Sequence, residues 1–209
     1  MIYQELLKNR EVKISLFKKY IKVMFFNIKY LKLKYFYFLF KIAYYKILFG
    51  QKVKINNLKL GFEKSCWLII KDKGRVSFGK TNYFSRGSNI EVYSGVITFG
   101  NNVFFNKNCS VVCRQNISFG NDVICGPNVN IYDHNHGIHV CEMSFGEQAY
   151  NSKSITIGNN VWVGANSTIS SGVTINNNVI IAANSVVTKD LDSDSMYGGV
   201  PAKIIKRLI

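Results

Sequence analysis

The feature that most constrains how this chain folds is an apolar residue that recurs at every sixth position in its C-terminal third. The repeat is carried by Ile157, Val163, Ile169, Ile175, Ile181 and Val187. A second series, two residues ahead of the first, consists of Ile155, Val161, Ser167, Val173, Val179 and Ser185. A helix repeats its apolar face about every 3.6 residues and a strand about every two, so neither alone explains this period. The period fits a parallel β-helix, in which each short strand turns a corner and adds an inward residue to a triangular prism.

The same spacing extends upstream and indicates where the coils turn and where they are interrupted. The upstream triplets are Phe78, Phe84 and Ile90, then Phe99, Phe105 and Val111, then Phe119, Cys125 and Ile131. Gly and Asn, which tolerate positive φ, recur in the tags GNNV at 100–103 and GNDV at 120–123, as tight corners require. The largest interruption follows a third face, so residues 132–154 are expected to leave the prism as one long loop. Loops of this length are usually functional or disordered, and this one contains YDHNHGIH, with all three histidines of the chain.

We therefore predict an all-β repeat domain over residues 51–209, preceded by an α-helical segment over residues 1–50. The helical segment contains neither Pro nor Gly before its last residue and is expected to form two helices that meet near Asn27. At the other end, the repeat is expected to stop after Asp190. The sequence GGVPAKIIKRLI then predicts a turn followed by a short basic strand or helix over the last coil.

Positive charge and aromatic residues are concentrated in residues 1–50. This segment holds eleven of the 27 Lys and Arg residues, against Glu5 and Glu11, and 14 of the 29 aromatic residues. Lysines interrupt every apolar run before it reaches about 18 residues, which argues against a membrane span. Interleaved Lys and aromatic residues are typical of a helix that lies in an anionic membrane interface. The alternative is a helical cap on the open end of the β-helix, whereas nucleic-acid binding is disfavoured because no binding motif accompanies the charge.

Cysteine usage and the N-terminal sequence indicate the compartment. The cysteines are Cys66, Cys109, Cys113, Cys125 and Cys141. Their number is odd and they form no metal-type CxxC pair, which favours reduced thiols in the cytosol. The N-terminus has no uninterrupted apolar region and no small-residue cleavage site, so we expect no secretory signal. We predict a cytoplasmic protein, peripheral at the inner face of the membrane if the basic segment binds lipid.

The hexapeptide repeats, the histidine-bearing loop and the closing GVPAK at 199–203 together resemble the hexapeptide-repeat acetyltransferases. The branch that this chain resembles contains the maltose, galactoside and nodulation-factor O-acetyltransferases and the capsule and lipopolysaccharide O-acetyltransferases. The resemblance implies a left-handed parallel β-helix, a hand that the period of six does not itself determine. It also implies a homotrimer, with active sites in the clefts between neighbouring prisms and with acetyl-CoA as co-substrate and no metal.

The family's functional residues map onto this sequence by motif. An ungapped count from the NVNI face at 128–131 puts the catalytic base at His136, whereas a one-gap alignment selects His134. On the acceptor side the resemblance implies Asn106 in FNKN and Trp162 in NNVW, and Asp133 is a candidate to orient one imidazole. The residues implied for binding acetyl-CoA are Ala165, Ala183, Thr188, Lys189, Lys203 and Lys206. The lysines of the C-terminal tail stand where the family often has Arg, which puts bidentate phosphate contacts in doubt.

The chemistry expected is transfer of an acetyl group from a thioester to a sugar hydroxyl, with an imidazole as general base. The acceptor would be a surface polysaccharide or its lipid-linked precursor. Within enzymes, an amino-sugar N-acetyltransferase or a xenobiotic acetyltransferase remains open. A zinc site formed by His134, His136 and His139 is a further alternative, although all three lie in one loop, whereas zinc sites constrain ligand geometry tightly. From another class, the chain is a structural or binding β-helix without catalysis, in which the histidines only belong to a solvated loop.

Overall fold

The computed structural model describes residues 33–56, 59–140 and 142–209. The chain divides into two units, Met1–Phe40 and Lys41–Ile209. Residues 33–49 are helical, and a single 3-10 turn, η1 (Gly50–Lys52), follows. The predicted helix is thus confirmed over its described part, while the junction expected near Asn27 lies outside the described residues. Among the described helices, none combines the length and the apolar character that crossing a membrane requires.

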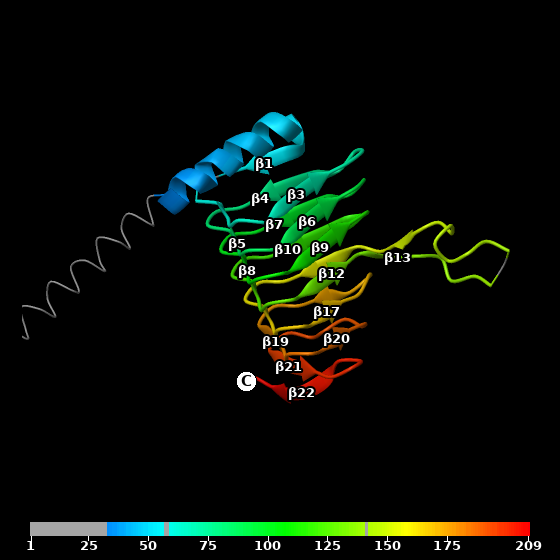
Figure 1. Ribbon diagram of the computed structural model, residues 1–209. Coiled ribbons are helices and arrows are strands. Elements are labelled where there is room, and N and C mark those ends of the chain that lie inside the picture. Colours follow the sequence, from blue (N-terminus) through cyan, green and yellow to red (C-terminus); the bar gives the residue numbers. More distant parts are fainter. Residues whose placement is uncertain (1–32, 57–58, 141) are drawn as a thin grey trace, which may run out of the picture. The chain divides into compact units, whose positions relative to one another are not determined.

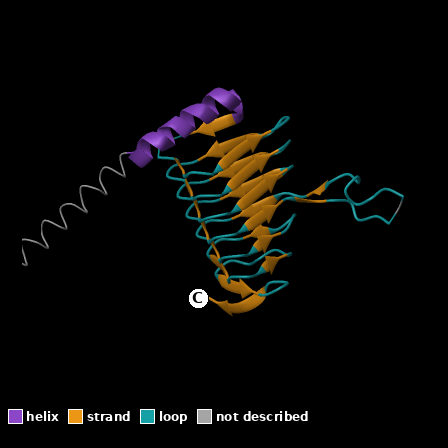
Figure 2. Ribbon diagram, viewed as in Figure 1, coloured by secondary structure: helices purple, strands orange, loops and turns teal. Residues whose placement is uncertain are grey.

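Most strands of the second unit fall in turn into three sheets, A, B and C, which form the faces of a triangular prism (Figures 1 and 2). Their strands run parallel, except for the last strand of sheet B. Sheet A consists of β1 (Val53–Ile55), β4 (Arg75–Phe78), β7 (Val96–Phe99), β10 (Asn116–Phe119), β15 (Ile155–Ile157) and β18 (Thr174–Ile175). Sheet B consists of β2 (Gly61–Phe62), β5 (Tyr83–Phe84), β8 (Phe104–Phe105), β11 (Ile124–Cys125), β16 (Trp162–Val163), β19 (Val179–Ile181), β21 (Ser195–Gly198) and β22 (Lys203–Arg207). Sheet C consists of β3 (Trp67–Ile70), β6 (Asn89–Val92), β9 (Ser110–Cys113), β12 (Asn130–Tyr132), β17 (Thr168–Ile169) and β20 (Val186–Val187). The predicted parallel β-helix is confirmed, and its hand stays a prediction from the resemblance.

The residues of the six-residue series point into the prism, as the period requires. In the N-terminal coils they are stacked aromatic rings: the centroids of Phe78 and Phe99 are 5.1 Å apart, and those of Phe99 and Phe119 are 4.8 Å apart. In the C-terminal coils the same positions are filled by aliphatic side chains such as Ile169 and Ile181, which are at most 1% exposed. Burial of one such side chain contributes about 1.5–3 kcal/mol. The stability of the prism is therefore distributed over many similar rungs.

The corners between sheets A and B explain the Asn and Gly of the repeated tags. The third residue of each tag adopts positive φ, as in Asn102 (57°) and Asn160 (54°). These side chains also bond from coil to coil, for example from Asn160 Nδ2 to Asn178 Oδ1 at 2.8 Å. The glycine of each tag is needed for lack of space and not for its φ angle. A Cβ on Gly120, for example, would lie 2.6 Å from a backbone atom of the next coil.

The N-terminal end of the prism is covered by the last part of the helix. Tyr45 is only 2% exposed, and its hydroxyl donates to the carbonyl of Cys66 and accepts from the amide of Leu68, both at 3.2 Å. Its ring packs edge-on against Phe62, with centroids 5.3 Å apart. The described residues 41–49 therefore form a cap on the first coil, as the alternative interpretation of the basic segment expects.

At the C-terminal end, the prism continues beyond the expected stop at Asp190. Leu191 forms a parallel bridge with Ile175, and β21 pairs in parallel with β19. Tyr197 on β21 is 8% exposed and fills the next inward position of sheet B. The expectation that the repeat ends at Asp190 is therefore wrong by part of one coil. Of the strand or helix expected for the basic tail, the structure has a strand, β22, which runs antiparallel to β21.

Candidate active site

The histidines lie on the loop over residues 132–154, which leaves the prism at the corner between sheets C and A (Figure 1). Its two arms pair at the base as β13 (His134–Asn135) and β14 (Asn151–Ser152). Farther out, Gln148 is 8% exposed and bonds to the backbone of His139, donating to its carbonyl at 2.8 Å and accepting from its amide at 3.0 Å. The amide of Gly137 donates to the carbonyl of Ala149 at 3.0 Å. The predicted excursion is confirmed, and these bonds hold its two arms together.

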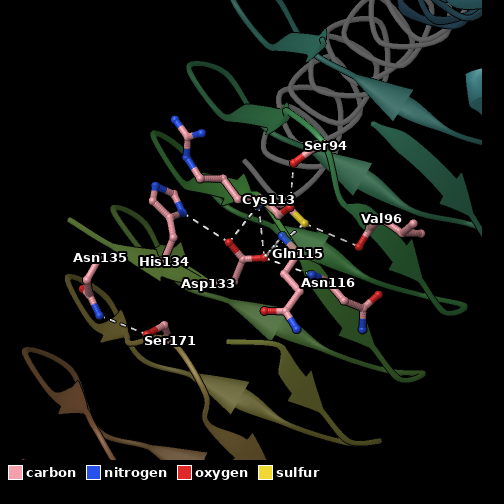
Figure 3. A network of polar contacts seen from close by, with 10 residues as sticks. Ser94, Val96, Cys113, Gln115, Asn116, Asp133, His134, Asn135 and Ser171 are labelled. Carbon is pink, nitrogen blue, oxygen red and sulfur yellow. Dashed lines mark hydrogen bonds and ion pairs between the residues drawn. The ribbon is translucent and has the colours of Figure 1, made fainter. Parts of the chain in front are cut away.

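Asp133 fixes the base of this loop to the prism (Figure 3). Its carboxylate is fully buried and accepts hydrogen bonds from the backbone amides of Arg114 and Gln115, both at 2.8 Å, and of Asn116 at 3.0 Å. These amides form the turn between β9 and β10 on the preceding coil. The thiol of Cys113 donates to the same carboxylate at 3.3 Å. Burial, together with the negative charge of Asp133, raises the pKa of the Cys113 thiol well above its usual value.

The carboxylate of Asp133 also holds the first histidine of the loop. Nδ1 of His134 lies 3.1 Å from Oδ1 of Asp133, and the His134 side chain is 15% exposed (Figure 3). Because a carboxylate oxygen accepts hydrogen bonds, this contact favours a proton on Nδ1 of the His134 ring. The candidate role of Asp133 in orienting an imidazole therefore has a matching contact, and the imidazole is that of His134.

His136 is exposed and lies beside a hollow of about 1120 Å³ on the loop. The hollow is lined by Asn135, His136, Gly137, Ile138, His139, Met143, Phe145, Gln148, Ala149 and Asn151. The ring centroid of His136 lies 4.4 Å from that of Tyr150, and His134 lies 5.3 Å from the same ring. Tyr150 therefore contacts both imidazoles from the returning arm of the loop.

Tyr150 in turn packs on Arg114, a contact that the sequence analysis missed. The guanidinium carbon of Arg114 lies 3.5 Å from the ring centroid of Tyr150 and 4.5 Å from that of Tyr93. Tyr93 and Arg114 occupy corner positions of ordinary coils, and Tyr150 lies far along the chain from both. No motif or spacing connects the three residues, so only the folded chain reveals this cluster.

The other candidate site residues lie elsewhere on the prism. Asn106 and Ala165 follow strands of sheet B at the corner towards sheet C, as does Ala183. Trp162 is 54% exposed and alternates with the buried Val161 and Val163, so it points outward from sheet B, as expected. Within one chain, these residues and the histidines of the loop therefore stand at different corners.

The other residues expected to bind acetyl-CoA are also divided between two places. Thr188 and Lys189 follow β20 at the corner between sheets C and A. Register places Thr188 and Lys189 two coils beyond Tyr132 and Asp133. The remaining pair, Lys203 and Lys206, is exposed on the antiparallel strand β22.

Metal chemistry has no evident ligand set in the part of the chain that the structure describes. Among residues 33–56, 59–140 and 142–209, no three His, Cys, Asp or Glu side chains lie close enough together to hold an ion. Cys66, Cys109, Cys113 and Cys125 are free thiols buried in the prism.

Comparisons with known proteins agree with this architecture. A family model described as "Bacterial transferase hexapeptide (six repeats)" matches residues 154–189. A putative lipopolysaccharide biosynthesis O-acetyl transferase, WbbJ, of Escherichia coli K12 is 33% identical over 159 residues, which cover 70% of this chain and 81% of that protein. Galactoside O-acetyltransferase of the same organism is 38% identical over 126 residues, but the match spans 60% of this chain and only 58% of that relative. A solved galactoside acetyltransferase in complex with coenzyme A superposes with a TM-score of 0.52 at 30% identity, covering 69% of this chain and 66% of that one.

Proposed function

Because the chain belongs to the hexapeptide-repeat acetyltransferase family, we propose that it transfers an acetyl group from acetyl-CoA to a sugar hydroxyl of a surface polysaccharide or its lipid-linked precursor. The observation that carries this proposal is a histidine-bearing loop that buried Asp133 ties to the corner of a prism with sequence similarity to O-acetyltransferases. A sugar acceptor is consistent with the galactoside and lipopolysaccharide enzymes among the relatives.

In the proposed reaction, the imidazole of His136 takes the proton of the acceptor hydroxyl as its oxygen attacks the thioester carbonyl. The C–S bond then breaks as the tetrahedral intermediate collapses, and the imidazolium returns the proton to the coenzyme A thiolate. A positioned base of this kind contributes about 10²–10⁴-fold to the rate. No covalent acetyl-enzyme is needed, because both substrates bind at once and the base acts on the hydroxyl directly.

His134 is the alternative base, and its surroundings differ from those of His136. The ring of His134 is half-buried and held by Asp133 at Nδ1, whereas His136 is exposed beside the hollow. We assign the base to His136 on the ungapped motif and on its place at the hollow. In this assignment His134 acts as a fixed neighbour of the reacting group.

We propose that the working enzyme is a homotrimer, because one prism does not bring the candidate groups together. The loop stands at the corner between sheets C and A, while Asn106 and Ala165 stand at the corner between sheets B and C. In a ring of three prisms, the loop of one subunit faces sheet B of its neighbour, where Trp162 and Asn106 contact the acceptor. Ala165 and Ala183 form a flat wall for the pantetheine arm, with Thr188, Lys189, Lys203 and Lys206 near the phosphates.

We also propose that the protein works in the cytoplasm, in peripheral contact with an anionic membrane through residues 1–50. Within the cap, Tyr45 is buried, but Tyr44 and Ile47 are 48% and 86% exposed. The neighbouring first coil, residues 51–75, holds seven Lys and Arg against Glu63 and Asp72. Each cation near an anionic surface contributes about 1 kcal/mol, so the protein should sediment with anionic vesicles and dissociate as salt rises. Equal sedimentation with neutral vesicles would contradict this part of the proposal.

The experiment that tests the proposed function is incubation with acetyl-CoA and panels of free sugars, surface polysaccharides and amino sugars, followed by mass spectrometry. The expected result is the mass gain of one acetyl group as an ester, which mild base removes. Acetylation at nitrogen would support the amino-sugar or xenobiotic alternative, and absence of both coenzyme A binding and acetylation would support a structural β-helix. Activity should persist after prolonged EDTA treatment, and its loss together with stoichiometric zinc would revive the metal alternative.

A further inference from the structure

We infer that Arg114 and Tyr150 form a clamp that positions the imidazole of His136 for proton transfer. The inference rests on the proposed function, because it concerns the base of that reaction. Neither residue belongs to the motifs by which the chain resembles its family. Both are positioning residues, since they act through His136 and not on the substrate.

The clamp begins with a guanidinium held between two aromatic rings. The guanidinium carbon of Arg114 lies 4.5 Å from the ring centroid of Tyr93 and 3.5 Å from that of Tyr150. A cation within about 6 Å of a ring centroid is attracted by the π-face, more strongly where water is excluded. Nε of Arg114 is buried and has no hydrogen-bond partner within the described residues. The described contacts of this guanidinium are therefore with the two aromatic rings, while its Nε makes no hydrogen bond to a described residue.

The inner side of the clamp is rigid because it belongs to consecutive coils. Register pairs Ile70 with Val92 and Val92 with Cys113, so the residues that follow them, Lys71, Tyr93 and Arg114, stack at one corner. Nζ of Lys71 lies 5.0 Å from the centroid of the Tyr93 ring.

Two further contacts fix the members of this stack. The hydroxyl of Tyr93 donates to Glu91 at 3.1 Å, and burial followed by this bond raises the Tyr93 pKa. The backbone amide of Arg114 is held by Asp133. Lys71, Tyr93 and Arg114 all follow strands of successive coils, so the stack is part of the prism and not of the loop.

Tyr150 connects the histidines to this stack, because its ring packs on Arg114 and lies beside both imidazoles. Its ring lies 4.4 Å from that of His136 at an angle of 46°, and 5.3 Å from that of His134 at 80°. Closer to the prism the loop is tied by the amide of Lys153, which donates to the carbonyl of Asp133 at 2.8 Å, and by Asn135, which donates to Ser171 at 3.0 Å. His136 lies just beyond these ties, and its contact with the Tyr150 ring joins its side chain to the anchored arm.

Four side-chain properties of the clamp can be separated by substitution. Tyr150→Phe keeps the ring and removes the hydroxyl, while Tyr150→Leu removes the aromatic face. Arg114→Lys keeps the charge but loses the flat guanidinium, which stacks on rings as an ammonium does not. Arg114→Leu removes both. Arg86→Leu, an exposed arginine on the coil before, is the matched control.

The test measures kcat and the KM for acetyl-CoA in the full-length protein, with melting temperature and oligomeric mass as checks on folding. Misplacement of a reacting group by about 1 Å costs up to about 10²-fold. We expect Tyr150→Leu and Arg114→Leu each to lower kcat about tenfold with KM within about twofold, and Arg114→Lys to fall between. Tyr150→Phe and Arg86→Leu should keep kcat within about twofold.

A double-mutant cycle with His136→Ala gives the decisive readout. If Tyr150 acts through His136, Tyr150→Leu should cause no further loss of kcat in the His136→Ala background. An equal loss in both backgrounds, or wild-type kcat for Tyr150→Leu, would overturn the clamp while leaving the proposed function in place. Loss of kcat in Tyr150→Phe equal to that in Tyr150→Leu would also overturn it, because the hydroxyl would then be the acting group. If His136→Ala itself keeps wild-type kcat, the assignment of the base fails and the clamp fails with it.

Discussion

The prism and the loop over residues 132–154 are held in place by different kinds of interaction. In the prism, buried apolar side chains occupy equivalent positions on successive coils, so stability is shared among many similar rungs. On the loop, position depends on a few polar and aromatic contacts, those of Asp133, Gln148 and Tyr150. The difference predicts that substitutions in the prism change folding and that substitutions on the loop change activity.

The largest effect on stability is expected from the aromatic stack inside the prism. Phe105 is 1% exposed and packs against Phe84, Phe99 and Phe119. Phe105→Ala should lower the free energy of unfolding by about 3–5 kcal/mol, because it removes buried contacts and leaves a cavity. Denaturant titration measures this. Phe104→Ala, on the same strand but pointing outward, is the control and should cost less than half as much; equal losses would contradict the inward–outward alternation.

An intermediate effect is expected where the two regions meet. Asp133→Asn keeps the shape of the side chain but replaces one carboxylate oxygen, an acceptor, with an NH2 group. This donor then faces the backbone amides of residues 114–116, which are donors as well. We expect a loss of about 1.5–3 kcal/mol, the usual contribution of hydrogen bonds to a charged group, together with a lower kcat. Asp122→Asn, at an exposed corner, should change neither. If Asp133→Asn lowers stability and leaves kcat unchanged, the anchor serves the prism alone.

The smallest effect is expected from raising the pH, which should lower the free energy of unfolding through a buried thiol of the prism. Burial raises the pKa of Cys109 from 9.0 to about 11. Between these values the unfolded chain loses a proton that the folded chain keeps, so the free energy of unfolding should fall as pH rises from about 9 to about 11. Below pH 9 both states hold the proton and this contribution is constant. Denaturant midpoints across this range measure the slope, which Cys109→Ala should reduce; an unchanged slope would show that Cys109 does not contribute.

The prism was predictable because the residues buried inside it recur at a regular spacing in the sequence. Burial at every sixth residue, as at Ile157 and Val163, can be counted in the sequence, and a loop must begin where the count stops, after Ile131. Even the missed part-coil carries that signal, because Tyr197 follows Leu191 at the same spacing. The cap was foreseen only as an alternative, because the bonds of Tyr45 to the first coil join residues that no period relates.

The candidate site was predictable only as a set of residue types. The sequence nominates His134, His136 and Asp133, but the groups that anchor Asp133 to the preceding coil are mainly backbone amides, which carry no sequence signal. The packing of Tyr150 on Arg114 likewise joins two positions whose meeting depends on the path of the loop. Sequence therefore indicates which groups are available, and the fold determines which of them are held.

The most direct test of the central claim compares kcat and melting temperature for His136→Ala and His134→Ala in the full-length protein. We predict that His136→Ala lowers kcat by about 10²–10⁴-fold while the melting temperature and the oligomeric mass stay at their wild-type values. His134→Ala should cost less, because its ring is a fixed neighbour and not the base. A reversed order would transfer the base to His134, and wild-type kcat in both variants would contradict the proposal that this loop performs the chemistry.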